Sequence, residues 1–166
     1  MGFEKQQLEK LAEAAHEVFC DGLRAKGYRY GPVTRDRDKE HSSLKPYSKL
    51  AEEEKQQNRN NVQDIPRKLA SIGYAMRLCY RNEPTAEFSK DEVDNLAKME
   101  HDRWMQQKLT ATARRGKTID QAKTRHKDLV PWDQLSQGGQ DKDRALVKGI
   151  PSILAKAGYT VVKRSK

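Results

Sequence analysis

The sequence predicts a mainly α-helical fold with a few short strands, in which one small unit occurs twice. Residues 11–74 align with residues 96–159 at a constant offset of 85 positions and without a gap, and about a quarter of the aligned positions are identical. A fixed internal period is typical of a duplicated supersecondary unit. Apolar residues recur at three- and four-residue steps in both copies, which indicates helices. We therefore expect two tandem repeats, each of two main helices plus short extended segments, packed about a pseudo-twofold axis.

The first helix of repeat one is expected over residues 4–26 and should end at Gly27. A short extended piece over 28–30, a charged loop over 34–40 and a compact apolar stretch over 44–50 should follow. The helix is predicted because six apolar residues share one of its faces: Leu8, Leu11, Ala12, Ala15, Phe19 and Leu23.

A second helix is predicted from Glu52 to Ile72. Three successive glutamates at its start complement the helix dipole. Pro66 lies inside the pattern and should kink the helix or restart it, because proline lacks a backbone N–H group. Gly73 should end the helix, and alternation over 74–78 predicts a strand.

A linker over residues 81–88 separates the repeats. Ser89 and Glu92 form a capping-box pattern that should open the first helix of repeat two. This helix should reach Leu109 and be longer than its counterpart, because residues 112–115 replace the extended piece of repeat one.

The rest of repeat two should follow the first copy, with an apolar stretch over 129–135, a helix over 140–157 and a strand over 159–162. We assign repeat one to residues 1–80 and repeat two to residues 89–166. Each copy alone would bury little apolar surface, so we expect one compact tandem module.

Composition limits the class of protein. Charged residues make up 34% of the 166 residues, and the mean hydropathy is −1.03. No apolar run approaches the ~20 residues of a membrane helix, and the first residues lack the apolar segment of a secretion signal. Cys20 and Cys79 occupy non-equivalent repeat positions. A soluble protein in a reducing, cytoplasmic compartment, with no membrane partner, is the simplest interpretation.

The formal net charge is +9, which favours anionic partners such as a nucleotide, a phosphate or a nucleic acid. The same charge is also compatible with a simple role in solubility. Because the cations are spread along the sequence, nucleic-acid binding is disfavoured, although charge alone leaves it open. A steep salt dependence of binding would support it.

The sequence gives no positive case for catalysis or for a cofactor. The segment from Arg114 to Thr118 resembles the end of a phosphate loop, but Ala111 stands where that motif needs a glycine. The histidine pairs His16/His101 and His41/His126 are interpreted as structural, because their spacing is not that of metal ligands.

Two further pairs repeat. Phe19 and Trp104 each lie one helical turn after a histidine, so they either belong to the core or stack on a planar ligand. Arg59 and Arg144 are expected to tie each second helix to a loop through bidentate hydrogen bonds.

The motifs of the two copies together resemble the ryanodine-receptor (RyR) repeat over nearly the whole chain. Repeat one carries His16-Glu17-Val18-Phe19, Gly27-Tyr28-Arg29-Tyr30-Gly31-Pro32-Val33, Leu44-x-Pro46-Tyr47-x-x-Leu50, Asn58-Arg59 and Leu69-Ala70-x-x-Gly73-Tyr74. Repeat two carries His101-x-x-Trp104, Pro131-Trp132-x-x-Leu135, Asp143-Arg144 and Gly158-Tyr159, and departs from the pattern at residues 112–125.

The resemblance implies a small helical tandem module of the kind found at the cytoplasmic periphery of calcium-release channels and as free-standing proteins in bacteria and phages. It also implies adenine-nucleotide binding between the repeats. Carried over by position, Phe19 and Trp104 would sandwich the base. Lys108 would face the phosphates, where repeat one has Leu23, and Arg35 is a second phosphate candidate.

We therefore expect a non-enzymatic module that binds an adenine nucleotide, or a nucleotide-derived signal, between the two repeats, either to sense it or to sequester it. It should need no cofactor and no metal. The alternatives are a protein-interaction scaffold whose aromatic residues belong to the core, a hydrolase or transferase without a recognisable motif, and a nucleic-acid-binding protein.

Overall fold

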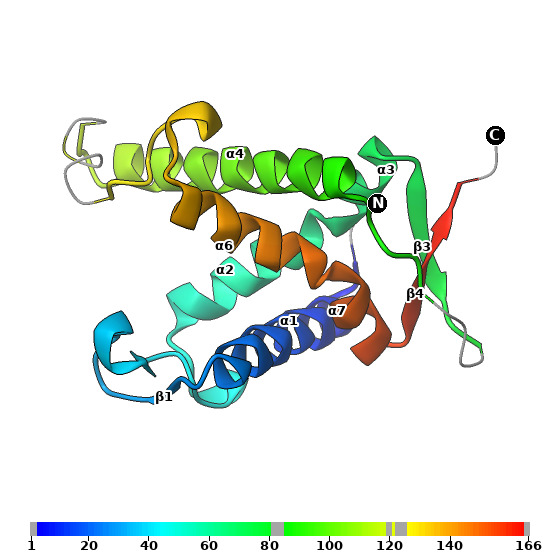
Figure 1. Cartoon of the computed structure of the whole chain (residues 1–166), viewed down its shortest axis with the longest axis horizontal. Coiled ribbons are helices and arrows are strands. Elements are labelled where there is room, and N and C mark those ends of the chain that lie inside the picture. The colour runs from blue at the N-terminus through cyan, green and yellow to red at the C-terminus, as the bar shows by residue number, and fades with distance from the viewer. Residues whose placement is uncertain (1–2, 81–84, 119–120, 122–125, 165–166) are drawn as a thin grey trace. The chain divides into compact units, whose positions relative to one another are not determined.

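The fold is mainly α-helical, as predicted (Figure 1). The computed structural model describes residues 3–80, 85–118, 121 and 126–164. The chain forms two compact units, unit 1 from residues 1–87 together with 149–166, and unit 2 from residues 88–148. The C-terminal part of repeat two thus belongs to the same unit as repeat one.

Unit 1 is built on the packing of helix α1 (Lys5–Ala25) against helix α2 (Glu52–Gln63). The backbone N–H of Glu4 donates to the side chain of Gln7 at 3.1 Å and opens α1. Gly27 follows the end of α1 with φ +87°, a conformation that glycine adopts without a steric penalty. The apolar core residues of these helices and of the next are fully buried or nearly so: Leu11, Ala12, Ala15, Val62, Ile65 and Leu69.

The predicted second helix is divided in two. Helix α3 (Ile65–Ser71) restarts directly after α2, with Pro66 in its first turn. Proline is tolerated there because the first N–H groups of a helix have no partner within it. Gly73, with φ +81°, follows the end of α3 as expected.

The charged loop contains more regular structure than the sequence indicated. Strands β1 (Arg29–Tyr30) and β2 (Glu40–His41) pair in parallel, and the 3-10 turn η1 (Asp36–Asp38) lies between them. Gly31 allows this close approach, since a Cβ atom there would lie 2.8 Å from the Cβ of Glu40. Two-residue strands leave no alternation in the sequence, so this pairing escaped prediction.

A two-stranded antiparallel ribbon joins the ends of the two repeats within unit 1 (Figure 1). It consists of β3 (Tyr74–Leu78) and β4 (Tyr159–Lys163). Its central pair is Met76 and Val161, which are equivalent positions of the two repeats. The ribbon is therefore symmetric about this pair, with each repeat contributing one strand.

Hydrogen bonds beyond the ends of the ribbon show the same symmetry. The Cys79 N–H donates to the Gly158 carbonyl at 2.9 Å, and the Arg164 N–H donates to the Gly73 carbonyl at 2.9 Å. The two donors, Cys79 and Arg164, are equivalent positions of the two repeats, and so are the two acceptors, Gly73 and Gly158. This mutual pairing explains why residues 149–166 belong to unit 1.

Helix α7 (Ile150–Lys156) packs against α1 and leads into β4. Ile150, Ile153 and Leu154 are buried. On the exposed side, the Lys156 ammonium lies 3.6 Å from a carboxylate oxygen of Glu17.

Unit 2 contains helix α4 (Lys90–Arg114), the 3-10 turn η3 (Trp132–Gln134) and helix α6 (Gln137–Lys148), with α4 packed against α6. The predicted capping box is confirmed. Ser89 N–H donates to Glu92 at 2.8 Å, and Glu92 N–H donates to the Ser89 hydroxyl at 3.2 Å. The core residues are Val93, Leu96, Ala97, Leu129, Leu135 and Val147.

Helix α4 begins at the position equivalent to the start of α1 but contains 25 residues against 21, so it is one turn longer. The expected greater length is confirmed, although the helix runs past the predicted Leu109 to Arg114. No helix among the described residues is long and apolar enough to cross a bilayer.

The prediction of one helix over residues 140–157 is wrong. α6 ends at Lys148 and α7 begins at Ile150, because Pro151 restarts the helix as Pro66 does in repeat one. The start is also earlier than predicted. The Ser136 hydroxyl accepts the N–H of Gly139 at 3.1 Å and so stabilises a first turn that contains two glycines.

Thr160 provides a test of packing in unit 1. Its side chain is 3% exposed, and its hydroxyl has no hydrogen-bond partner within the described structure. Because a buried, unpaired hydroxyl is costly, Thr160→Val should stabilise the protein by about 1 kcal/mol and raise the melting temperature by about 2–4 °C. A Thr160→Ser control keeps the hydroxyl and should lower the melting temperature. A lower melting temperature for Thr160→Val would show that the hydroxyl is paired.

Candidate ligand-binding site

Four rings come together in each repeat, the repeat-one set within unit 1 and the repeat-two set within unit 2. We name them the ring clusters. The repeat-one ring cluster is His16, Phe19, His41 and Tyr47, and the repeat-two ring cluster is His101, Trp104, His126 and Trp132. All members are paired by the repeat offset, so the same arrangement has formed twice.

A buried histidine anchors each ring cluster. His16 Nε2 lies 2.6 Å from the Lys45 carbonyl oxygen, and His101 Nε2 lies 2.6 Å from the equivalent carbonyl of Val130. A carbonyl oxygen only accepts hydrogen bonds, so Nε2 carries the proton in both rings. The two histidines are 4% and 2% exposed, which fits the structural role inferred from the sequence. His16 ties α1 to the segment before the 3-10 turn η2 (Tyr47–Lys49), and His101 ties α4 to the segment before η3.

The aromatic residue one turn after each anchor is held by the second histidine of the same repeat. Phe19 meets His41 edge to face, with ring centroids 5.3 Å apart and an angle of 76°. Trp104 meets His126 at 6.1 Å and 89°. Such edge-to-face contacts fix ring orientation. The histidines were predicted to be structural, but their convergence on Phe19 and Trp104 was not foreseen.

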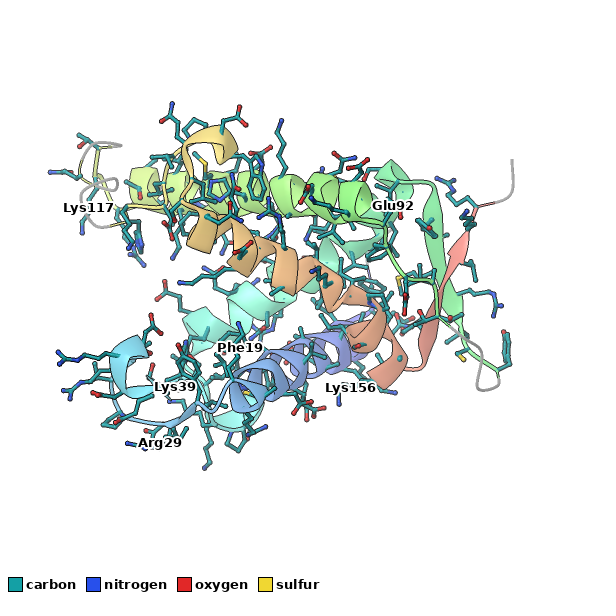
Figure 2. The ribbon with its side chains drawn as sticks, in the orientation of Figure 1. Phe19, Arg29, Lys39, Glu92, Lys117 and Lys156 are labelled. Atoms are coloured by element: carbon teal, nitrogen blue, oxygen red, sulfur yellow. The ribbon has the colours of Figure 1, made fainter. Side chains whose placement is uncertain are left out.

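The exposure of these aromatic rings separates them from the core. Phe19 lies on α1 and is 43% exposed, whereas Leu11 on the same helix is fully buried (Figure 2). Trp104 is half-buried. Both rings thus keep accessible surface while their orientation is fixed by neighbouring histidines.

Tyr47 links the repeat-one ring cluster to a charged network. Its hydroxyl donates to Glu9 at 3.1 Å, and the Arg59 guanidinium donates to the other oxygen of the same carboxylate. Arg59 and then Tyr47 lower the pKa of Glu9, against the opposing effect of burial. Burial and the bond to Glu9 raise the pKa of Tyr47 to about 12. The Lys55 ammonium lies 5.7 Å from the centre of the Tyr47 ring.

Repeat two replaces the tyrosine hydroxyl with a cation–π contact. Arg144 donates to Asp94 at 2.7 Å and to Asp141 at 2.8 Å, and Asp94 is the principal cause of its raised pKa. The guanidinium also lies 5.5 Å from the centre of the Trp132 ring. The prediction that Arg59 and Arg144 tie helices to loops is wrong, because each joins the second helix of its repeat to the first.

The two candidate phosphate ligands lie in different units. Lys108 is half-buried on α4, one turn after Trp104, as predicted. Arg35 is exposed just before η1, and its backbone pairs with Glu40. Phe19 and Arg35 belong to unit 1, and Trp104 and Lys108 belong to unit 2.

One cysteine–histidine contact was not expected from the sequence, and it does not form a catalytic dyad. Cys20 Sγ lies 3.3 Å from His16 Nε2, one helical turn away. That nitrogen already donates its proton to the Lys45 carbonyl, so it has no lone pair with which to deprotonate the thiol. Burial raises the pKa of Cys20, and the thiol points to the Ser43 carbonyl at 3.8 Å. This thiol is therefore held in its unreactive, protonated form.

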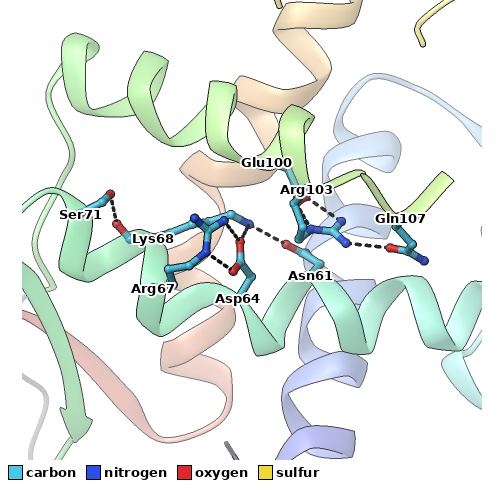
Figure 3. Close-up of polar contacts among 8 residues, drawn as sticks. All are labelled: Asn61, Asp64, Arg67, Lys68, Ser71, Glu100, Arg103 and Gln107. Carbon is cyan, nitrogen blue, oxygen red and sulfur yellow. Dashed lines mark hydrogen bonds and ion pairs between the residues drawn. The ribbon is translucent and has the colours of Figure 1, made fainter. Parts of the chain in front are cut away.

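Two buried charges also escaped prediction, and each occurs in only one repeat (Figure 3). Lys68 in unit 1 is fully buried, with its ammonium 3.5 Å from Asn61 and 3.8 Å from Asp64. Glu100 in unit 2 is 2% exposed and accepts two hydrogen bonds from Arg103. The equivalent positions in the other repeat hold an isoleucine and an alanine, so the alignment of the repeats did not indicate these charges.

Over the described residues, no cluster of His, Cys, Asp and Glu suits a metal ion.

The lowered pKa of Glu9 predicts a specific acid sensitivity. Ionised Glu9 stabilises the fold fully above its ordinary pKa of 4.5, and this contribution is lost as pH falls through the lower pKa of the folded state. Glu9→Gln should therefore lower stability at pH 7 and flatten the loss of stability on acidification below about pH 5. Urea unfolding followed by circular dichroism at several pH values measures both effects.

The control for this experiment is Glu13→Gln, which removes the same charge from an exposed position of α1. An equal change in both variants would show that the contact with Arg59 is not the source.

The protonated state of Cys20 predicts slow chemical modification. In a Cys79→Ser background, Cys20 in the native protein should react with iodoacetamide at least about tenfold more slowly than in the urea-unfolded protein, because its thiol is buried and its pKa is raised. Mass spectrometry at timed intervals measures the rate. Fast alkylation of the native protein at pH 7 would contradict the inactive geometry described above.

Comparison with known families agrees with the duplicated geometry. The model of the RyR domain matches the chain twice, over residues 4–78 and 86–163. The two matches contain the two ring clusters and the two arginine networks in the same order. The chain therefore belongs to the RyR domain family and carries two tandem copies of the domain.

Proposed function

We propose that this protein is a non-enzymatic module that binds an adenine nucleotide, or a nucleotide-derived signal, with one aromatic ring from each repeat. Phe19 and Trp104 would stack on the base. The observation that carries the proposal is the pair of equivalent aromatic rings, each oriented by two histidines and each keeping accessible surface.

Preorganised rings suit stacking because little side-chain freedom remains to be lost on binding. Base–aromatic stacking contributes about 1–3 kcal/mol per base, which corresponds to about a 5- to 150-fold gain in affinity. Tryptophan offers a larger surface than phenylalanine, so we expect Trp104 to contribute more than Phe19.

Basic groups near each ring support a phosphate-bearing ligand. Lys108 follows Trp104 by one turn of α4. Arg35 lies after strand β1, which pairs with β2, the strand that contains His41. The formal net charge of +9 attracts anions over a longer range.

A non-enzymatic role is supported by the chemistry of the ring clusters. His16 and His101 use Nε2 to bind backbone carbonyls. Cys20 has a raised pKa and no general base at its sulfur. Sensing or sequestering a ligand requires only binding, which this arrangement favours.

The alternative is a protein-interaction scaffold, and one observation favours it. Tyr30 and Val33, close to the strand that carries His41, are 54% and 57% exposed. Exposed aromatic and apolar side chains are typical of protein-binding surfaces.

Isothermal titration with adenine nucleotides, cyclic nucleotides and ADP-ribose derivatives tests the proposal. At least one ligand should bind, and Trp104→Ala should weaken it by about 5- to 150-fold while the circular dichroism spectrum stays unchanged. Tyr80→Ala is the matched control, since Tyr80 is 80% exposed and makes no ring contact in the described structure.

The stoichiometry tests the use of both repeats. One ligand per chain, with losses of affinity in both Phe19→Ala and Trp104→Ala, is the expected result. Two ligands per chain would assign each ring cluster its own site. Absence of binding, together with unfolding of Trp104→Ala, would favour the scaffold.

A further inference from the structure

The extra turn of α4 ends in a group of exposed cations that repeat one lacks. Arg114 lies in the last turn of the helix, Arg115 caps it, and Lys117 follows in the next turn of chain. We call these three residues the basic tip. All three side chains are exposed, and Figure 2 shows Lys117 beyond the end of α4.

The cations of the basic tip are not neutralised within the described structure. None of the three makes an ion pair or a side-chain hydrogen bond there, and only their backbone groups are paired. The corresponding region of repeat one differs. Arg24 pairs with Asp21 at 3.5 Å, and Arg29 pairs with Glu40 at 3.3 Å.

The sequence shows that the net charge of the segment after the first helix is much higher in repeat two. Residues 28–42 contain four cations and three acids, whereas the equivalent residues 113–127 contain six cations and one acid. The three acids of repeat one are replaced by Gln121, Lys123 and Arg125. The segment in which the two copies depart from one another is thus strongly basic in repeat two only.

A structural role accounts for only part of this charge. Cations in the last turn of a helix interact favourably with its dipole, and this effect falls off within one turn. In α1 the cations that interact with the helix dipole are Arg24 in the last turn and Lys26 at the C-cap. The basic tip places a third cation beyond the helix, where the dipole contributes little.

The position of Trp104 indicates the kind of polyanion that fits. At 100° per residue, Arg115 and Lys108 lie within about 40° of Trp104 around the axis of α4. Trp104 and Arg115 are separated by about 16 Å along that axis. An aromatic ring and a row of cations on one helix face are the elements that bind unpaired bases together with a phosphate backbone.

We propose that the basic tip is a docking surface for the phosphate backbone of a single-stranded nucleic acid, which continues along α4 toward Trp104. Phosphate contacts by these exposed side chains release counterions and need no pocket. The strand would share Trp104 and Lys108 with the nucleotide proposed above, whereas none of the three residues of the basic tip was assigned to that ligand. Removal of the basic tip therefore separates the two kinds of binding.

The test compares two triple variants with the same change in charge. Arg114→Gln/Arg115→Gln/Lys117→Gln removes the basic tip. Arg24→Gln/Lys26→Gln/Arg37→Gln removes three cations from the end of α1 and the segment that follows it. Binding of a fluorescein-labelled oligothymidylate of about 20 nucleotides is measured by anisotropy between 50 and 200 mM salt. Three single-strand contacts correspond to a change of about 2 in the slope of log affinity against log salt.

We expect the tip variant to lose about tenfold or more of the affinity at the lowest salt and the repeat-one variant to lose less than about threefold. Nucleotide binding by the tip variant should equal that of the wild type, and melting curves confirm that both variants fold. Equal losses in the two variants would overturn the proposal, because net charge alone would then explain binding. It would also be overturned if removal of the tip weakened binding only to vesicles of phosphatidylserine and phosphatidylcholine in equal amounts.

Discussion

A single hydrogen bond, from a buried histidine to a part-buried backbone carbonyl, organises each repeat. It joins the first helix to the segment before the 3-10 turn at 2.6 Å in both copies, from His16 to Lys45 and from His101 to Val130. If the histidine were removed, this part-buried carbonyl would lose its partner at a cost of about 1 kcal/mol. The bond also orients the imidazole against which the next aromatic ring lies. Both the position of the apolar stretch and the geometry of the ring clusters therefore depend on it.

A second duplicated contact holds the helix pair of each repeat together. Arg59 joins α2 to α1 through Glu9, and Arg144 joins α6 to α4 through Asp94. The bidentate fork of arginine suits this role, since one side chain binds carboxylates on both helices. The two arginine networks differ in the aromatic residue that joins them. Repeat one uses the hydroxyl of Tyr47, whereas repeat two places the guanidinium over the ring of Trp132.

The two repeats share the residues that hold each of them together but differ in the charge of the segment after the first helix. The histidines and arginines that hold each repeat together are identical in both. The segment after the first helix instead differs, being nearly neutral in repeat one and strongly basic in repeat two. Buried charge has also become specific to one copy, with Lys68 in one repeat and Glu100 in the other. Such divergence is expected when the packing contacts of a duplicated unit are constrained and its surfaces are free to acquire separate partners.

Many features of the fold were predictable because they depend on neighbours in the sequence. Helical periodicity, the capping box of Ser89 and the restart at Pro66 are local, and the constant offset revealed the duplication. Pro151 carries the same local signal as Pro66, so the break between α6 and α7 also has a cause within the sequence. Phe19 and Trp104 were found because equivalent aromatic residues recur one turn after a histidine.

The sequence by itself therefore determined the helices, the repeat and the candidate rings. Only the tertiary structure decided what those rings contact. His41 and His126 each contact a ring 22 positions earlier in the sequence, β3 pairs with β4 about 85 positions away, and Arg59 binds the neighbouring helix. Local sequence preferences act over a few residues, whereas these contacts form only after the whole chain has paid the entropy of closing its loops. No pattern within one element records them.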